Sequence, residues 1–385
     1  MGGEYNQVGW GLMFDTTGFW QKIILFVIIL VAIYAIVNLV FLRKTKNKGK
    51  IQNIMINVLL GIGLFYLFLR IFILIPDVLD PGYFFMQTIV NSVTQVCVLA
   101  LATTGIVLIF KTSTTTNFSQ GMVATFGAFV AARLIIHLVA TYTAMGNTTV
   151  VLLGILGSGI TGFLLGICID VFVIRKSKIS TPISKQMITM GLVIMFSGAM
   201  PIIFGTLPIT IPRLSYDPNV IFTIFGKTLS ITVSALYALG ISVILLGLLF
   251  SALRFTKWGL GVRATASNEV VASMMGVNTR IITAFSWGIA GLLGGVAAVI
   301  LAPNSGNVQV ALMIPTQVNG FMAAILGSFS SFAGPLLASI LIPVLSGLLV
   351  FVVPLWQNAV VYIIILVIVL VKPFGLFGKP IAKKV

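Results

Sequence analysis

The sequence predicts an all-α, polytopic membrane protein, and three observations support this fold class. Of the 385 residues, 59% are hydrophobic and 8% are charged, whereas a soluble domain has about 25% charged residues. Long apolar runs recur along the chain, most of them near the ~20 residues that a helix needs to cross a bilayer. The 23 Lys and Arg residues, against 7 Asp and Glu, gather between these runs, which is typical of membrane topology rather than of nucleic-acid binding.

The apolar runs predict about 10–11 transmembrane helices. Gly and Pro residues interrupt the ninth and tenth runs, so one or both could be short, broken or re-entrant helices. The first run is not a cleaved signal peptide, because Glu4 and Asp15 precede it and no basic segment does. The predicted spans are 19–42, 51–75, 87–110, 119–142, 149–174, 187–207, 229–253, 281–302, 310–328, 334–353 and 356–371.

The basic residues predict the orientation. If the N-terminus is outside and the spans alternate, the cytoplasmic segments contain all Lys and Arg residues except Lys22, Arg70, Arg133, Arg213 and Lys227. Five of the seven acidic residues then lie on the other side, namely Glu4, Asp15, Asp77, Asp80 and Asp217. We therefore expect a multi-pass membrane protein with its N-terminus outside and its C-terminus in the cytoplasm.

Several function classes lack the residues that they need. Cys97 and Cys168 both lie inside apolar runs, so no disulfide framework is expected, and His137 alone cannot build a zinc site. The triplet Gly226–Thr228 resembles the end of a P-loop, but Ile221 occupies the position of the required first glycine. A soluble enzyme, a DNA-binding protein and an ATPase are all disfavoured, and we expect no metal, no cofactor and no catalytic residue.

Two pairs of glycines predict close helix packing. Gly162 and Gly166 are four residues apart in one span, and Gly291 and Gly295 are four apart in another. Such small residues let helix backbones approach closely, and packing alone explains both pairs.

A polar row in the third span is the first candidate for a translocation path. Asn91 and Gln95 are four residues apart with Thr94 nearby, and Thr103 and Thr104 follow two to three turns later. Such a row faces either other helices, as interhelical hydrogen bonds, or a water-filled path. We favour the path, because a packing contact needs only one or two such groups.

Two further polar segments complete the predicted path. The segment 112–121 is too polar for a span, so we expect a connection that caps the next helix at Asn117 or Ser119, or one that folds partly back into the membrane. Near the break in the ninth span lie amide side chains, which transporters place at broken helices, although Gly and Pro also mark ordinary loops. The predicted path residues are Asn91, Thr94, Gln95, Thr104, Asn117, Gln120, Gln317 and Asn319.

The loop 254–280 predicts a short helix outside the membrane. We expect Gly259 and Gly261 to break the preceding span, Ser267 or Asn268 to cap a helix that starts at Glu269, and the segment 276–278 to end it. The apolar side of this helix carries Val270, Val271, Met274 and Met275. It could dock on a partner or lie on the lipid headgroups.

Three blocks of the sequence carry a resemblance to a known family: 91–134, which contains NFSQG, then 259–303, which contains ASMMGVN, and 320–349 with the ending VKPFGLFG. They resemble the branched-chain amino acid permease subunits of ABC importers. Their order and spacing match, over about residues 86–378. The chain departs from the family pattern in its extra 1–85 segment, in Met122, where relatives often have an acid, and at Asn319–Gly320, where relatives often have a basic residue.

The resemblance implies a type II ABC-importer-like permease in the plasma membrane of a prokaryote. Residues 86–385 would form the permease domain, and 1–85 an N-terminal extension with about two transmembrane helices. The expected partners are two ABC ATPase subunits, which bind the ATP, a second permease subunit and an extracellular substrate-binding protein, in addition to the lipid bilayer. By analogy the 267–277 helix would couple to the ATPase through Asn268, Glu269, Ala272, Met274, Met275 and Gly276.

The expected substrates are branched-chain or other apolar amino acids, and nucleosides, amides or urea are the alternative. A secondary transporter would usually carry carboxylates within its spans for ion coupling, and here only Asp170 lies in a predicted span. A structural subunit without a path would leave the polar row unexplained.

Overall fold

The computed structural model describes residues 81–142, 145–177, 181–352, 355–372 and 374–378. Its internal contacts separate a unit of residues 85–348 and 374–385 from a second unit that contains residues 349–373. The spans predicted at 19–42 and 51–75 lie outside the described residues.

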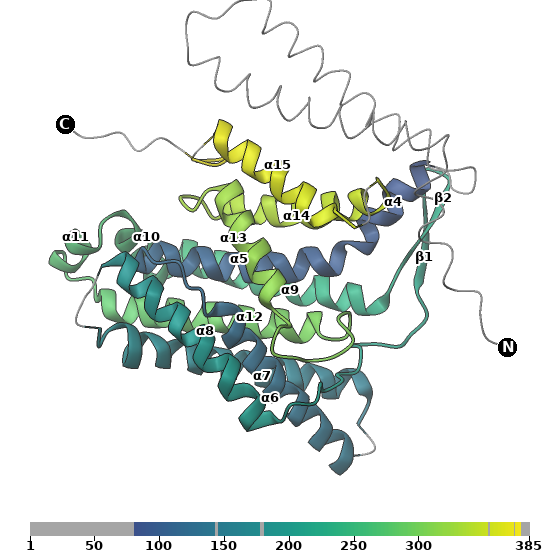
Figure 1. The fold of residues 1–385 in the computed structure, drawn as a ribbon, viewed down its shortest axis with the longest axis horizontal. Helices are drawn as coiled ribbons and strands as arrows, with labels where there is room; N and C mark the ends of the chain where they lie inside the picture. Colours follow the sequence, from purple (N-terminus) through teal and green to yellow (C-terminus); the bar gives the residue numbers. More distant parts are fainter. Residues whose placement is uncertain (1–80, 143–144, 178–180, 353–354, 373, 379–385) are drawn as a thin grey trace, which may run out of the picture. The chain divides into compact units, whose positions relative to one another are not determined.

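Helices make up most of the described part of the chain (Figure 1). The elements are α4 (Pro81–Asn91), α5 (Val93–Ser113), α6 (Gln120–Thr141), α7 (Asn147–Cys168) with its π-helical continuation η1 (Ile169–Ile174), α8 (Pro182–Phe204), β1 (Val220–Ile224), β2 (Lys227–Ile231), α9 (Val233–Phe255), α10 (Lys257–Ser267), α11 (Glu269–Met274), α12 (Thr279–Leu301), α13 (Ile314–Gly327), α14 (Ala333–Val352) and α15 (Gln357–Val371).

Seven helices of the described residues are long and apolar enough to cross a membrane: α5, α6, α7 with η1, α8, α9, α12 and α14. This confirms the all-α, multi-spanning fold. Of the residues in an apolar stretch of each helix, 78% are buried in α12 and 72% in α5. Only 22% are buried in α9 and 28% in α8. Helix α12 packs against α5, α6 and α7, so it lies at the centre of its unit, whereas α8 and α9 lie at the periphery.

The glycines predicted to mediate packing meet one another between α7 and α12. A Cβ atom added to Gly162 would lie 2.2 Å from the carbonyl oxygen of Gly291, and one added to Gly166 would lie 2.2 Å from that of Trp287. A Cβ at Gly295 would lie 2.6 Å from the carbonyl oxygen of Ser158. The two glycine pairs therefore form one close backbone contact, as the sequence predicts for small residues four apart.

One predicted span is interrupted in the structure, and the ninth is short, which its Gly and Pro residues had allowed. The span 87–110 is broken, because α4 ends at Asn91 and α5 begins at Val93; the Ser92 hydroxyl donates to the carbonyl of Thr88 (2.8 Å), a bond that competes with regular helix geometry. The ninth span is the short helix α13, whose 14 residues extend only about 21 Å. The tenth, α14, is continuous through Pro343.

A β-hairpin between α8 and α9 was not expected from the sequence. Val220–Ile224 pairs antiparallel with Lys227–Ile231 across a two-residue turn in which Phe225 and Gly226 both have positive φ, at 48° and 74°. Such turns match the twist of paired strands. The start of α9 is consequently at Val233 rather than 229. Figure 1 places this hairpin and the α10–α11 pair at opposite ends of the helix bundle.

Candidate functional site

The loop 254–280 contains two helices rather than one. Helix α9 ends at Phe255, and the hydroxyl of Thr256 caps α10 by accepting from the Gly259 N–H (3.1 Å). The expectation that Gly259 and Gly261 break the span is therefore wrong, because both lie inside α10. Glycine instead lets α10 lie close to the end of α9, because a Cβ at Gly259 would lie 2.3 Å from the carbonyl oxygen of Leu253.

Local hydrogen bonds define the short helix α11 as predicted. The Asn268 side-chain oxygen accepts from the N–H groups of Val270 (3.0 Å) and Val271 (3.1 Å), which makes Asn268 the N-cap and not Ser267. At the other end, Gly276 adopts φ +85°, a conformation that suits glycine and ends the helix. The sequence prediction of a discrete helical element is confirmed.

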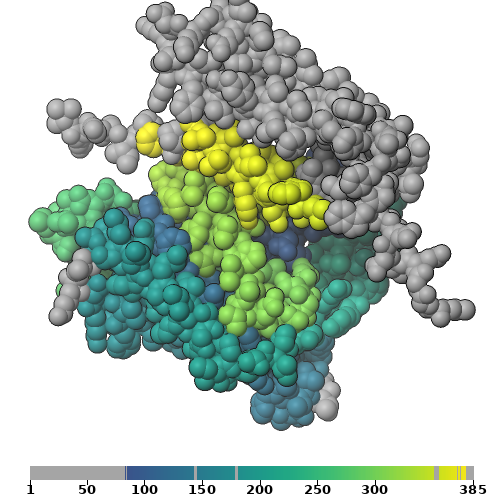
Figure 2. All heavy atoms as spheres, in the orientation of Figure 1, coloured from purple at the N-terminus to yellow at the C-terminus, as the bar shows by residue number. Residues whose placement is uncertain are grey.

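Helix α11 presents apolar side chains to its surroundings. Met274 is 80% exposed and Met275 79%, and Val270 and Val271 are also exposed, whereas Ala272 is buried. The helix lies at one edge of its unit, as the green helix in Figure 1 and the green atoms in the same place in Figure 2 show. An exposed apolar cluster at the tip of a projecting loop is typical of a protein contact.

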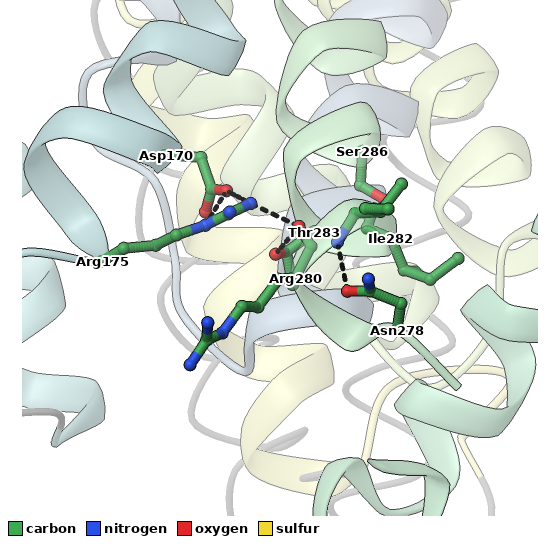
Figure 3. A network of polar contacts seen from close by, with 8 residues as sticks. Asp170, Arg175, Asn278, Arg280, Ile282, Thr283 and Ser286 are labelled. Carbon is green, nitrogen blue, oxygen red and sulfur yellow. Dashed lines mark hydrogen bonds and ion pairs between the residues drawn. The ribbon is translucent and has the colours of Figure 1, made fainter. Parts of the chain in front are cut away.

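Polar contacts join the exit of this loop to the end of α7 (Figure 3). The carboxylate of Asp170 pairs with Arg175, and the same guanidinium donates to the main-chain carbonyl of Arg280 in the first turn of α12. Asn278 caps α12 by accepting from the N–H of Ile281 (3.3 Å). In the sequence, Asp170 stands out only as an acid within a predicted span, and a spacing of five residues does not predict its pair with Arg175 on an α-helix.

The segment between α5 and α6 folds back along α5. The Gln120 side-chain nitrogen donates to the carbonyl of Ala102 (3.2 Å), which is eleven residues before the end of α5 at Ser113, or about 16 Å along that helix. Helix α6 therefore begins beside the middle of α5. Asn117 does not cap α6: its oxygen accepts from the N–H (2.9 Å) and the hydroxyl (2.8 Å) of Ser119, and Ser119 itself makes no side-chain cap.

The first half of α13 meets the start of α6 and the middle of α5. Gln317 accepts from the N–H of Gly121 (2.6 Å) and donates to the carbonyl of Phe118. A Cβ at Gly320 would lie 2.8 Å from Cδ1 of Ile106, so glycine at this departure from the family pattern lets α13 approach α5 closely. The ring of Phe321 packs against that of Phe118, with 5.1 Å between the ring centroids. These contacts together fix α13 against both helices.

A small cavity lies where α5, α6 and α13 meet. Its volume is about 10 Å³, which is close to the space needed for one water molecule. Gln120, which is 4% exposed, lines it together with Gln317, and the side-chain oxygen of Gln120 has no hydrogen-bond partner in the part of the chain that the structure describes. Of the predicted path residues, the structure brings Gln120 and Gln317 together here, whereas Asn117 does not line the cavity.

The remaining predicted path residues do not form one continuous row. Asn91 and Gln95 are exposed, and Asn91 accepts from the Gln87 side chain (2.8 Å). Thr104 is buried and donates to the carbonyl of Ala100 (2.7 Å). Because Gln95 and Thr104 are nine residues apart, they lie about 180° apart around α5. Thr94 and Asn319 are both partly buried.

The fold and these sites define a multi-pass helical membrane protein with a projecting loop that ends in an exposed apolar helix. The family described as the branched-chain amino acid transport system permease component matches residues 88–370, so the chain belongs to this family of transport permeases.

Curated relatives agree with this family. The high-affinity branched-chain amino acid transport system permease protein LivH of Salmonella typhimurium is 24% identical over 306 residues, which cover 78% of this chain and 98% of the relative. LivH of Escherichia coli K12 is 23% identical with the same coverage. The ribose import permease protein RbsC of Haemophilus influenzae is 22% identical over 70% of this chain and 77% of the relative. No solved structure matches the chain.

Proposed function

We propose that the chain is the membrane-spanning permease subunit of an ATP-driven importer of branched-chain or other apolar amino acids. The observation that carries this proposal is the family match over residues 88–370, together with relatives that are named as branched-chain amino acid permeases. The chain itself would perform no covalent chemistry and bind no cofactor. Residues 86–385 would be the permease domain and 1–85 an accessory module.

The ATPase would dock on α11. The apolar side chains of α11 are exposed and available to a partner, whereas its Ala272 is buried against the rest of the chain. The contact would include Asn268, Glu269, Ala272, Met274, Met275 and Gly276. Basic residues near this end of the bundle, among them Arg254, Lys257 and Arg263, favour a cytoplasmic position for it and an external position for the hairpin.

The path would begin at the exposed amides of α4 and α5. Asn91 and Gln95 are exposed beside helices that are otherwise apolar, and an unsatisfied polar group in hydrocarbon costs several kcal/mol. A second permease subunit or the water of a passage would therefore cover this face. An uncharged polar lining suits a zwitterion whose two charges partly cancel.

The proposal is tested by uptake into vesicles that contain the chain with its ATPase, second permease subunit and binding protein. We expect ATP-dependent uptake of labelled leucine, with competition by isoleucine and valine but not by nucleosides or urea. Competition by nucleosides or urea alone would favour the alternative substrate class. Uptake that needs an ion gradient and no ATP would contradict an ABC importer.

Cysteine labelling tests the path residues. With Cys97 and Cys168 replaced, cysteine at position 91 or 95 should react with a small water-soluble thiol reagent in at least one nucleotide state of the complex. Cysteine in place of Thr104 should stay protected, because that side chain is buried. Protection of positions 91 and 95 in every nucleotide state would show that this face is packed and dry.

A further inference from the structure

A buried carboxylate ties the end of α7 to the start of α12. Asp170 is 2% exposed, and its pair with Arg175 is the one ion pair found among the described residues. Removing a carboxylate from water is costly unless a positive charge and hydrogen bonds compensate. An ionisable group kept within an apolar span therefore points to a functional role.

The π-helical turn η1 makes this pair possible. In an α-helix, residues five apart lie about 140° apart around the axis, so their side chains diverge. In η1 the N–H of Arg175 donates to the carbonyl of Asp170 (3.0 Å), which brings residue 175 back over residue 170. The Nε and Nη2 atoms of Arg175 then both donate to Oδ2 of Asp170, at 2.9 and 2.5 Å.

The same guanidinium also holds the other helix. Its Nη2 atom donates to the carbonyl of Arg280, the second residue of α12, which also accepts from the Thr283 hydroxyl (3.1 Å; Figure 3). Arg280 follows the last residue of α11, Met274, by only six positions. Because the guanidinium is planar and has several fixed donors, it can bind a carboxylate and a carbonyl at once.

We propose that Arg175, held by Asp170, is a positioning residue that makes the ends of α7 and α12 move together when α11 is displaced. The close glycine contact joins α7 and α12 again further along their length. A displacement of α11 would therefore move these two spanning helices together, as one rigid pair. This inference rests on the proposed docking of the ATPase on α11.

The test replaces the ion pair by apolar side chains of similar length, Asp170→Leu with Arg175→Met. The Asp170 side chain is buried, whereas that of Arg175 is 30% exposed. Replacing both partners of such a pair is often neutral for stability, whereas removing Arg175 alone leaves a buried unpaired charge. We expect normal membrane abundance and normal ATPase binding, with at least a tenfold increase in ATP hydrolysed per substrate imported. A wild-type ratio in this variant would overturn the proposal.

Two further variants keep the test decisive. Lys176→Met removes the neighbouring exposed charge without touching the contacts of Asp170, and it should leave the ratio unchanged; an equal increase in this control would overturn the proposal.

If the double variant does not accumulate, Arg175→Lys keeps the charge but not the planar fork, and we expect at least a threefold increase in the ratio. A wild-type ratio there would overturn the proposal.

Failure of the proposed function would look different. No ATP-dependent uptake by the unchanged complex would contradict the function itself, and full coupling after substitutions on α11 would contradict the docking of the ATPase on that helix. Uncoupling by α11 substitutions together with normal coupling in the Asp170→Leu, Arg175→Met variant would contradict only the role of Arg175.

Discussion

Leucine in place of Gly162 is expected to prevent the protein from accumulating in the membrane. A Cβ at Gly162 would lie 2.2 Å from the carbonyl oxygen of Gly291, and a Cβ at Gly291 would lie 2.0 Å from that of Gly162. Both obstacles are backbone atoms, which cannot rotate away, so α7 and α12 would have to separate. Overpacking a core typically costs about 1–3 kcal/mol, and separating the central helix adds to that cost. Abundance in the membrane fraction and thermal unfolding in detergent measure the effect.

Gly240→Leu is the matched control. This glycine also lies within a spanning helix, α9, but no atom of the described residues lies within 4 Å of the place where its Cβ would be. We expect near-normal abundance for this variant. Equal loss in both variants would mean that leucine disturbs any glycine position in these helices and that the α7–α12 contact is not special.

Glu269→Lys combined with Met274→Asp is expected to abolish uptake while the protein still inserts. Both positions are exposed, so the fold of the chain should tolerate the changes, whereas a docked partner would bury an unpaired charge. We expect at least a tenfold loss of uptake and weaker ATPase binding, measured by transport in vesicles and by co-purification of the ATPase. Normal uptake in this variant would rule out α11 as the coupling contact.

Phe225→Asp provides the control for this substitution. Phe225 is 86% exposed in the hairpin turn, at the other end of the bundle, and its positive φ suits Asp well. The variant should bind the ATPase as the unchanged chain does. Equal loss of ATPase binding would indicate a general effect of an added acid.

Local signals explain the parts of the fold that could be predicted from the sequence. Apolar runs of sufficient length predict spanning helices, because lipid requires the backbone to satisfy its own hydrogen bonds. Asn268 and Gly276 mark the two ends of α11, because a cap and a positive φ depend on a few neighbouring residues. The spacing of Gly162 and Gly166 likewise predicts a close helix contact.

The candidate site was predicted only in part. Gln120 and Gln317 do line one cavity, but Asn117 does not, and Thr104 lies on the opposite side of α5 from Gln95 and is buried. The spacing of nine residues already places these two side chains on opposite sides of an α-helix, so the predicted row was inconsistent with the helical period. The role of each residue in transport stays a prediction.

The sequence by itself determined the fold class, most of the spans and the ends of α11, because each depends on hydrophobicity or on hydrogen bonds between near neighbours. Only the tertiary structure decided that α6 starts beside the middle of α5, and that Arg175 joins Asp170 to Arg280. These features depend on partners that are up to 105 residues apart in the chain. No local pattern specifies such a partner, because it is fixed only when the helices pack.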